Sequence, residues 1–220
     1  MQLMRCEKGR SDGELIDLKP SKIIGIGVNY RAHAAEMGKP LPEEPLIFLK
    51  PPSALLPHGG AILRPADYAR VDFEGELGVV IGTRASRLAP GEAMTAVAGL
   101  VCVNDVTVRD LQSKDGQWAR AKGFDTFCPL GPRMVSGLDP ADLAITTRVN
   151  GEVRQASRTS DLIFGVAALI AFVSRHMTLL PGDVISTGTP AGVGNLTVGD
   201  VVEVEIEGIG ILANTVAAGP

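Results

Sequence analysis

Short runs rich in valine and isoleucine alternate with glycine and proline along most of the chain. Such runs, bounded by turn-forming residues, are typical of β-strands. They predict strands at residues 23–28, 47–50, 76–81, 99–104, 145–149, 184–187, 201–206 and 210–216. Asn150-Gly151 separates two polar-alternating runs and predicts a two-residue hairpin turn.

Helical periodicity is sustained in only one long segment, residues 160–175. Its apolar side chains recur at the spacing of one helix face. We expect Ser160 to cap the start of this helix, while Arg175 and His176 suit its C-terminal end. Shorter helical turns are predicted at 30–37, 90–96 and 107–112. The pattern indicates one β-rich domain with few helices.

Composition narrows the class of protein. The 220 residues are enough for one sizeable core, and 45% hydrophobic against 21% charged residues excludes a disordered or coiled-coil chain. A net charge of −4 without a basic block gives no electrostatic case for nucleic acid as a partner.

Targeting signals are not visible in the sequence. The charges spread over residues 1–22 do not suit a signal peptide, and the apolar stretch 162–173 is too short to span a bilayer. Three cysteines without a CxxC pair do not form a disulfide framework, and Cys102 is expected to pack as a small hydrophobe. We therefore expect a soluble cytoplasmic protein without a membrane partner.

Two glutamates, Glu74 and Glu76, lie two residues apart in an otherwise apolar run. In a strand they point to the same face, and burying them is costly unless a cation neutralises them. Asp105, which ends a second apolar run, can supply a third oxygen ligand. Such a set suits Mg²⁺ or Mn²⁺ better than zinc. The alternative, equally compatible with the spacing, is the solvated face of an edge strand.

His33 and Glu36 are three residues apart within a predicted helical turn. On one helix face the carboxylate could orient and polarise the imidazole. Gly38 would end the turn, and the prolines that follow would stiffen a small lid. An exposed pair without a role is the competing interpretation, and the spacing alone favours it.

Arg109, Gln112 and Lys122 follow Asp105 closely. Arg109 could hold a substrate carboxylate, Gln112 could position a carbonyl or a water, and Lys122 could stabilise developing negative charge. The alternative is a solvated basic surface made of Arg109, Lys114, Arg120 and Lys122.

The glycine-rich loop 187–194 follows a predicted strand, and its N–H groups, with Gly188 and Thr189, could hold an anion. It lacks the Gly-Lys-Ser/Thr of a P-loop. Gly25-Ile26-Gly27 lacks the third glycine of the dinucleotide fingerprint, so we reject a nicotinamide cofactor.

Taken in order, these segments resemble the fumarylacetoacetate hydrolase superfamily, in particular its small single-domain branch of acylpyruvate hydrolases and oxaloacetate decarboxylases. The resemblance runs from about residue 22 to the C-terminus and rests on several motifs at once. They are Gly27-x-Asn29-Tyr30 with His33 and Glu36, Phe48-Leu49-Lys50-Pro51, Phe73-Glu74-x-Glu76-Leu77, Asn104-Asp105 with Arg109 and Gln112, Lys122-x-Phe124, and the Thr187–Gly194 loop.

The resemblance implies an α+β, β-rich fold with a mixed β-roll, in a homodimer. Residues 22–220 would form the catalytic domain, and residues 1–21 a short N-terminal segment, at most an edge hairpin. It further implies Mg²⁺ or Mn²⁺ on Glu74, Glu76 and Asp105, and catalysis by His33, Glu36 and Lys122. Substrate contacts fall to Arg109, Gln112, Gly188 and Thr189.

Two reactions fit these residues. One is hydrolysis of acylpyruvate-type 2,4-dioxo acids, such as fumarylpyruvate or acetylpyruvate, to pyruvate and a carboxylic acid. The other is decarboxylation or isomerisation of oxaloacetate or of a 2-oxo tricarboxylate from aromatic catabolism. The site residues do not separate them, because both reactions form the same enolate, although hydrolysis ranks first. A non-catalytic module that binds a 2-oxo acid or a metal is the third hypothesis.

Overall fold

The computed structural model describes residues 1–10 and 12–219, which form three β-sheets and four α-helices. The largest sheet has nine strands in the order β2-β1-β11-β9-β8-β14-β3-β4, with β5 paired to β11. Its strands are β1 (Gln2–Glu7), β2 (Gly13–Asp17), β3 (Ile23–Gly27), β4 (Leu46–Lys50), β5 (Leu55–Pro57), β8 (Gly75–Ile81), β9 (Val97–Asn104), β11 (Cys128–Ser136) and β14 (Val184–Ser186).

The second sheet has five strands in the order β13-β12-β16-β17-β6, and the third is a small sheet ordered β10-β7-β15. Their strands are β6 (Ala61–Arg64), β12 (Ala144–Val149), β13 (Glu152–Arg158), β16 (Val201–Ile206), β17 (Gly210–Ala218), β7 (Val71–Phe73), β10 (Thr107–Val108) and β15 (Gly194–Asn195). The helices are α1 (Arg31–Glu36), α2 (Arg109–Asp115), α3 (Ala119–Lys122) and α4 (Val166–His176), with 3₁₀ turns at Pro52–Ala54, Ala93–Ala96 and Thr159–Asp161.

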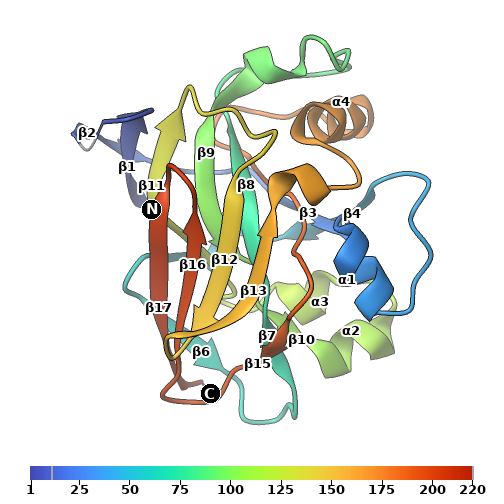
Figure 1. The fold of residues 1–220 in the computed structure, drawn as a ribbon, viewed down its shortest axis with the longest axis vertical. Helices are drawn as coiled ribbons and strands as arrows, with labels where there is room; N and C mark the ends of the chain where they lie inside the picture. The colour runs from blue at the N-terminus through green and yellow to red at the C-terminus, as the bar shows by residue number, and fades with distance from the viewer. Residues whose placement is uncertain (11, 220) are drawn as a thin grey trace.

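The core lies between the two larger sheets. Strands β12, β16 and β17 face β8 and β9, while α4 lies beyond one end of the sheets and α1 to α3 lie to one side (Figure 1). The main cluster joins apolar residues of both sheets to one face of α4, among them Leu77, Leu100, Ile145, Val204 and Leu169. The fold is therefore α+β and β-rich, as predicted.

Every strand expected from the sequence forms, with ends within a few residues of the prediction. Asn150 and Gly151 both have positive φ angles, 54° and 82°, as the predicted hairpin turn requires. The N-terminal segment is a hairpin, because β1 and β2 pair antiparallel and β2 lies at the sheet edge. All three cysteines are free and buried, and Cys102 packs in the main core.

The predicted start of the long helix is wrong. Residues Thr159–Asp161 form a 3₁₀ turn, and α4 begins only at Val166, after Gly165 at its N-cap. Asn29 explains the delay, because its backbone carbonyl accepts from Ile163 N and its side chain from Phe164 N, at 2.8 Å each. The expected cap, Ser160, instead donates to Asp142 at 2.8 Å.

Two shorter helical predictions are wrong in their bounds. Residues 107–108 extend into β10 and the helix begins at Arg109, while in 90–96 only Ala93–Ala96 is helical and forms a 3₁₀ turn. The long strand β11 was not predicted, because Pro129 and Pro132 interrupt its pattern. The sheet tolerates them beside a register shift between Gly131 and Val135.

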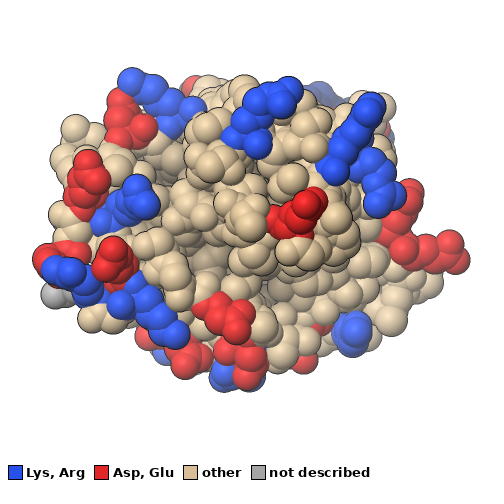
Figure 2. Space-filling model, turned by 90° about the horizontal axis from the view of Figure 1, so that it is seen from above, with Lys and Arg blue, Asp and Glu red and all other residues tan. Residues whose placement is uncertain are grey.

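Among the residues that the structure describes, no helix is both long and apolar enough to cross a membrane. The surface in Figure 2 carries acidic and basic side chains side by side rather than a continuous field of one sign.

Candidate active site

The antiparallel pair β8 and β9 brings the three predicted carboxylates together. Gly75 pairs with Asn104, so Glu74 before β8 and Asp105 after β9 lie at the same end of the two strands. Asp105 N donates to Glu74 O at 2.8 Å. One oxygen each of Glu74, Glu76 and Asp105 lies within 4.8 Å of the others. Because all three side chains are buried and β8 is an interior strand, the solvated edge-strand alternative is wrong.

Glu74 is held by two cations. Lys122 Nζ donates to its Oε2 at 2.8 Å, and Arg109 Nη2 lies 2.5 Å from its Oε1. Burial alone would raise the pKa of Glu74, but Lys122 and Arg109 outweigh it and lower that pKa well below its usual range. Glu74 is therefore a carboxylate at neutral pH.

Asp105 contacts two buried lysines. Lys122 Nζ donates to its Oδ2, and Lys50 Nζ donates to its Oδ1 at 2.5 Å. Lys50 was not predicted to contact the site. The available signal was a single charge in the otherwise apolar run Leu46–Lys50 of β4, since a charge buried in a strand needs a partner.

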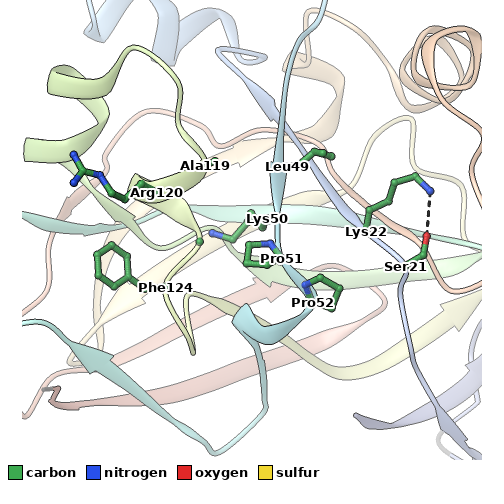
Figure 3. Close-up of a pocket in the computed structure, with 10 residues that line it drawn as sticks. Ser21, Lys22, Leu49, Lys50, Pro51, Pro52, Ala119, Arg120 and Phe124 are labelled. Atoms are coloured by element: carbon green, nitrogen blue, oxygen red, sulfur yellow. Dashed lines mark hydrogen bonds between the residues drawn. The ribbon is translucent and has the colours of Figure 1, made fainter.

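The side chain of Lys50 also borders a surface pocket of about 580 Å³. Figure 3 shows this pocket, with Lys50 between Pro51 and the segment of Ala119 and Phe124. Among the described residues that line this pocket, no predicted site residue is present. This pocket is therefore separate from the carboxylates.

Glu76 has hydroxyl and amide partners. Ser186 Oγ donates to its Oε2 at 2.6 Å and Gly188 N at 2.8 Å. No ion pair of Glu76 is found within residues 1–10 and 12–219. Burial, together with the charges of Asp105 and Glu74, raises the pKa of Glu76 to about 8.

The glycine-rich loop serves these carboxylates. Gly188, at a φ of 102°, directs its N–H at Glu76. Thr189 Oγ1 donates to Gly75 O at 2.9 Å and accepts from Gln155 Nε2 at 2.8 Å. Gln155 also donates to Pro190 O at 2.7 Å. The structure thus places Gly188 and Thr189 where they hold the loop against β8, and it adds Gln155, which the sequence did not indicate.

The carboxylate cluster fits a hard divalent cation. It offers only oxygen ligands, and the ammonium of Lys122, which bridges Glu74 and Asp105, shows that the cluster accommodates a positive charge. Glu76 makes no ion pair among the described residues, so a cation bound between the three carboxylates would give it a charge partner. Mg²⁺ or Mn²⁺ is the kind of ion that such a set holds.

The predicted pair of His33 and Glu36 forms on α1. His33 Nδ1 lies 3.0 Å from Glu36 Oε2, with His33 buried and Glu36 partly exposed. Glu36 Oε1 also accepts from Gly192 N at 3.1 Å, which connects α1 to the glycine-rich loop. Gly38, with a φ of 63°, follows the end of the helix as predicted. The alternative of an exposed pair is wrong for His33, whose imidazole is buried, and correct for Glu36, whose side chain is 40% exposed.

Arg109 lies on α2 beside Gln112, as predicted. Its Nε donates to Asp72 Oδ2 and its Nη1 to Gln112 Oε1, both at 2.8 Å. The solvated-surface alternative is correct for Lys114 and Arg120, which are exposed. It is wrong for Lys122, which is 1% exposed, and for Arg109, whose side chain is 15% exposed and ion-paired.

A small cavity of about 20 Å³ joins these groups. A water molecule needs roughly 10–15 Å³, so the cavity has room for about one. The lining includes His33, Glu74, Glu76, Arg109, Gln112, Lys122 and Thr189, together with Met37, Phe48 and Trp118. Acid–base groups and carboxylates therefore meet in one enclosed place.

Comparison with known proteins places this arrangement in context. The model of the fumarylacetoacetate (FAA) hydrolase C-terminal family matches residues 22–217. Oxaloacetate tautomerase YisK of Bacillus subtilis is 44% identical over 212 residues, which cover 90% of this chain and 70% of that protein.

Solved structures show the same fold. The 5-carboxymethyl-2-hydroxymuconate delta-isomerase from Mycobacterium smegmatis superposes with a TM-score of 0.88 at 48% identity, covering 95% of this chain and 87% of the other. Fumarylpyruvate hydrolase from Pseudomonas aeruginosa, solved with Mn²⁺ and pyruvate, has a TM-score of 0.88 at 31% identity and covers 99% of this chain and 96% of that one.

Proposed function

The chain belongs to the fumarylacetoacetate hydrolase family, and we propose that it is a Mg²⁺- or Mn²⁺-dependent enzyme that acts on small 2-oxo acids. The reaction that we propose first is the tautomerisation of oxaloacetate. The observation that carries the proposal is the buried cluster of Glu74, Glu76 and Asp105 in contact with Lys122. Two proteins named for isomerisation reactions, the oxaloacetate tautomerase and the delta-isomerase, are 44% and 48% identical to this chain, which supports tautomerisation.

The residues divide the work of moving one proton. A divalent cation on Glu74, Glu76 and Asp105 would supply Lewis-acid polarisation of the 2-oxo group. His33, oriented by Glu36 through Nδ1, would exchange the proton at C3 through its other ring nitrogen. Lys122 would stabilise the negative charge that develops on the 2-oxygen. In the enol-to-keto direction, protonated His33 would give its proton to C3 and the imidazole would then take up the enol hydroxyl proton, so His33 returns to its starting state.

Hydrolysis of acylpyruvates is the second candidate, and the pair of His33 and Glu36 favours it. An imidazole held 3.0 Å from a carboxylate is a suitable general base for water. Attack of that water on the 4-carbonyl would cleave the C3–C4 bond and release pyruvate and a carboxylic acid. Both reactions use the same groups, so the fate of the substrate depends on whether water enters the cavity.

A panel of substrates tests the proposal. Tautomerisation is followed by the loss of the enol absorbance of oxaloacetate. The other reactions are followed by the release of pyruvate from oxaloacetate, acetylpyruvate and fumarylpyruvate. Each assay is run with Mg²⁺, with Mn²⁺ and with a chelator. We expect metal-dependent tautomerisation to be the fastest reaction. Faster pyruvate release from an acylpyruvate would assign the hydrolase activity instead. Binding of pyruvate without turnover of any substrate would favour the non-catalytic module.

The position of His33 gives a sharper test. His33→Ala is expected to lower the rate of tautomerisation about 10²–10⁴-fold, because it removes the general acid–base group. The matched control is His176→Ala, since His176 lies at the exposed end of α4 and its Nδ1 lies 2.9 Å from Phe172 O. Tautomerisation by His33→Ala at the rate of the control would exclude the proposed role.

A further inference from the structure

Two aromatic side chains form the apolar wall of the cavity that holds the candidate active site. Phe48 comes from the edge strand β4, and Trp118 immediately precedes α3. Their ring centroids lie 5.4 Å apart with the planes tilted by 58°. They line the same cavity as His33 and Lys122, so a substrate in it would meet both rings.

Both rings lie directly on the backbone of β3. A Cβ atom built on Gly25 would approach Phe48 Cζ to 2.1 Å, and one built on Gly27 would approach Trp118 Cζ3 to 2.4 Å. Glycine is required at both positions, because any side chain would collide with a ring. The rings cannot withdraw toward β3, since they already contact its backbone.

Two lysine side chains lie close to the rings of this wall. Lys122 Nζ lies 4.8 Å from the centroid of Phe48 and 5.9 Å from that of Trp118. Lys39, just after α1, also lies 5.9 Å from Trp118. Such cation–π contacts strengthen when they are shielded from water. The backbone adds a further link, because Lys122 N donates to Trp118 O at 3.1 Å. The wall is therefore built together with the lysine of the site.

Another side chain in the lining is freer to move. Met37 is 37% exposed and follows the last residue of α1. Methionine is unbranched and adapts its shape easily. A cavity of about 20 Å³ cannot hold a 2-oxo acid without a displacement. Met37 can provide that displacement, whereas the backbone of β3 blocks Phe48 and Trp118 from moving toward it.

We infer that Trp118 and Phe48 are specificity-determining residues, which limit the enzyme to 2-oxo acids with a small group beyond C3 and exclude aryl substituents. This inference rests on the proposed function and adds the class of substrate. Oxaloacetate and acetylpyruvate meet the limit, and acids with an aromatic group at C3 or C4 do not.

Binding of two probes tests the limit without turnover. Calorimetry on the Mn²⁺-loaded protein gives the Kd values of pyruvate and of phenylpyruvate, which differ by one phenyl group. We expect Trp118→Ala to lower the ratio of the phenylpyruvate Kd to the pyruvate Kd at least about tenfold, because a hydrophobic pocket discriminates by size on this scale. Trp118→Phe, which keeps a ring against Phe48 and guards against misfolding of the larger truncation, should give a smaller change.

The matched control is Phe172→Ala. Phe172 is a partly buried aromatic residue on α4, in contact with His176 and outside the cavity lining. The ratio of the phenylpyruvate Kd to the pyruvate Kd in Phe172→Ala should equal the ratio in the wild type. The chain has a single tryptophan, so a change in its emission on adding pyruvate gives an independent sign that the ligand reaches Trp118.

Each outcome decides a different statement. An unchanged ratio in both Trp118 variants would overturn the inference. If the wild type binds neither pyruvate nor phenylpyruvate in the presence of Mn²⁺, the inference and the proposed function are both overturned. A changed ratio without turnover of oxaloacetate or of any acylpyruvate would support the inference as a binding property and overturn the proposed reaction.

Discussion

At the scale of single residues, Glu76 differs from its two neighbours. Its pKa is raised to about 8 by burial and by the charges of Asp105 and Glu74, so Glu76 is largely protonated at pH 7 in the metal-free protein. A metal ligand must be deprotonated. Binding of Mg²⁺ or Mn²⁺ should therefore release a proton.

The proton release is measured by calorimetry of Mn²⁺ binding in buffers of different ionisation enthalpy. At pH 7 we expect close to one proton per ion, and affinity should rise with pH and level off only above about pH 8, once Glu76 is ionised in the metal-free protein as well. Glu76→Gln should bind Mn²⁺ more weakly and release no proton at this step. Heats that are independent of buffer in the wild type would contradict the prediction.

Lys50 gives a second prediction at this scale. Its side chain has no exposed surface and its Nζ lies 2.5 Å from Asp105 Oδ1. Removing one partner of a buried ion pair costs about 3–5 kcal/mol. Lys50→Met, which keeps most of the side-chain volume, should lower the free energy of unfolding by this amount. A divalent cation should restore part of it, because it neutralises Asp105 in place of the ammonium.

Lys22→Met is the matched control for Lys50→Met. Lys22 forms its ion pair with Asp183, at 2.5 Å, and its side chain is 19% exposed. Denaturant unfolding with and without Mg²⁺ should show a metal-dependent rescue for Lys50→Met and none for Lys22→Met. Equal rescue in the two variants would refute a specific link between Lys50 and the carboxylate cluster.

Some residues of the site were predictable from the sequence and others were not, for a physical reason. Glu74, Glu76 and Asp105 stand out because a carboxylate in an apolar run is costly to bury, which is visible in the local sequence. Lys50 reaches Asp105 across 55 positions, and Gln155 reaches Thr189 across 34. Partners so distant are set by strand register, which a local pattern does not contain.

At the scale of elements, the strands followed from local composition but the start of α4 did not. The periodic stripe of residues 160–175 continues upstream of the helix, where Asn29 removes the backbone donors that a longer helix would use. Propensity and periodicity were overridden by a contact 135 positions away. Strand β11 was not predicted, because its prolines disfavour a strand in the local sequence. The sheet nevertheless accommodates them.

Asn29→Ala tests this connection. The buried Asn29 side chain accepts from Phe164 N, and its Nδ2 donates to Phe164 O at 3.0 Å and to Thr187 O at 2.8 Å. An unsatisfied buried group costs about 1–3 kcal/mol, so the variant should lose roughly 3 kcal/mol or more of unfolding free energy. Mn²⁺ affinity should also fall, because Thr187 precedes Gly188, whose N–H holds Glu76.

Asn214→Ala separates the two effects. Asn214 is buried on β17, where its Nδ2 donates to Pro57 O and Gly60 O at 2.9 Å each, outside the candidate site. It should lose comparable stability in thermal unfolding while keeping the Mn²⁺ affinity of the wild type. If Asn29→Ala also keeps that affinity, Asn29 supports the fold but not the loop.

At the scale of the whole molecule, strand β14 joins the two halves of the large sheet, pairing with β8 on one side and β3 on the other. Asp183 precedes this strand. Its carboxylate accepts from Ser21 N at 2.9 Å, Lys22 N at 3.1 Å and Leu180 N at 2.8 Å. It thus connects the start of β14 to the segment before β3, across up to 162 positions.

The charge of Asp183 makes the stability of the fold depend on pH. Burial opposes ionisation, but the hydrogen bonds from Lys22, Leu180 and Ser21 outweigh it and lower the pKa of Asp183 below its usual value. A carboxyl group with a lowered pKa stabilises the folded state fully above its unfolded pKa, about 3.9. That contribution should be lost as the pH falls through 3.9 toward the lower folded value.

Asp183→Asn should accordingly cost about 2 kcal/mol or more at pH 7, because a hydrogen bond to a charged group contributes about 1.5–3 kcal/mol and several are weakened. The difference from the wild type should shrink as the pH falls below about 3.9, because the unfolded chain then binds a proton that the folded wild type does not bind. Asp142→Asn is the control, since Asp142 makes an exposed ion pair with Arg158 at 2.6 Å. Denaturant unfolding from pH 3 to 7 measures the free energy of unfolding of both variants. A loss of stability in Asp183→Asn that does not change with pH would show that the charge of Asp183 does not contribute to stability.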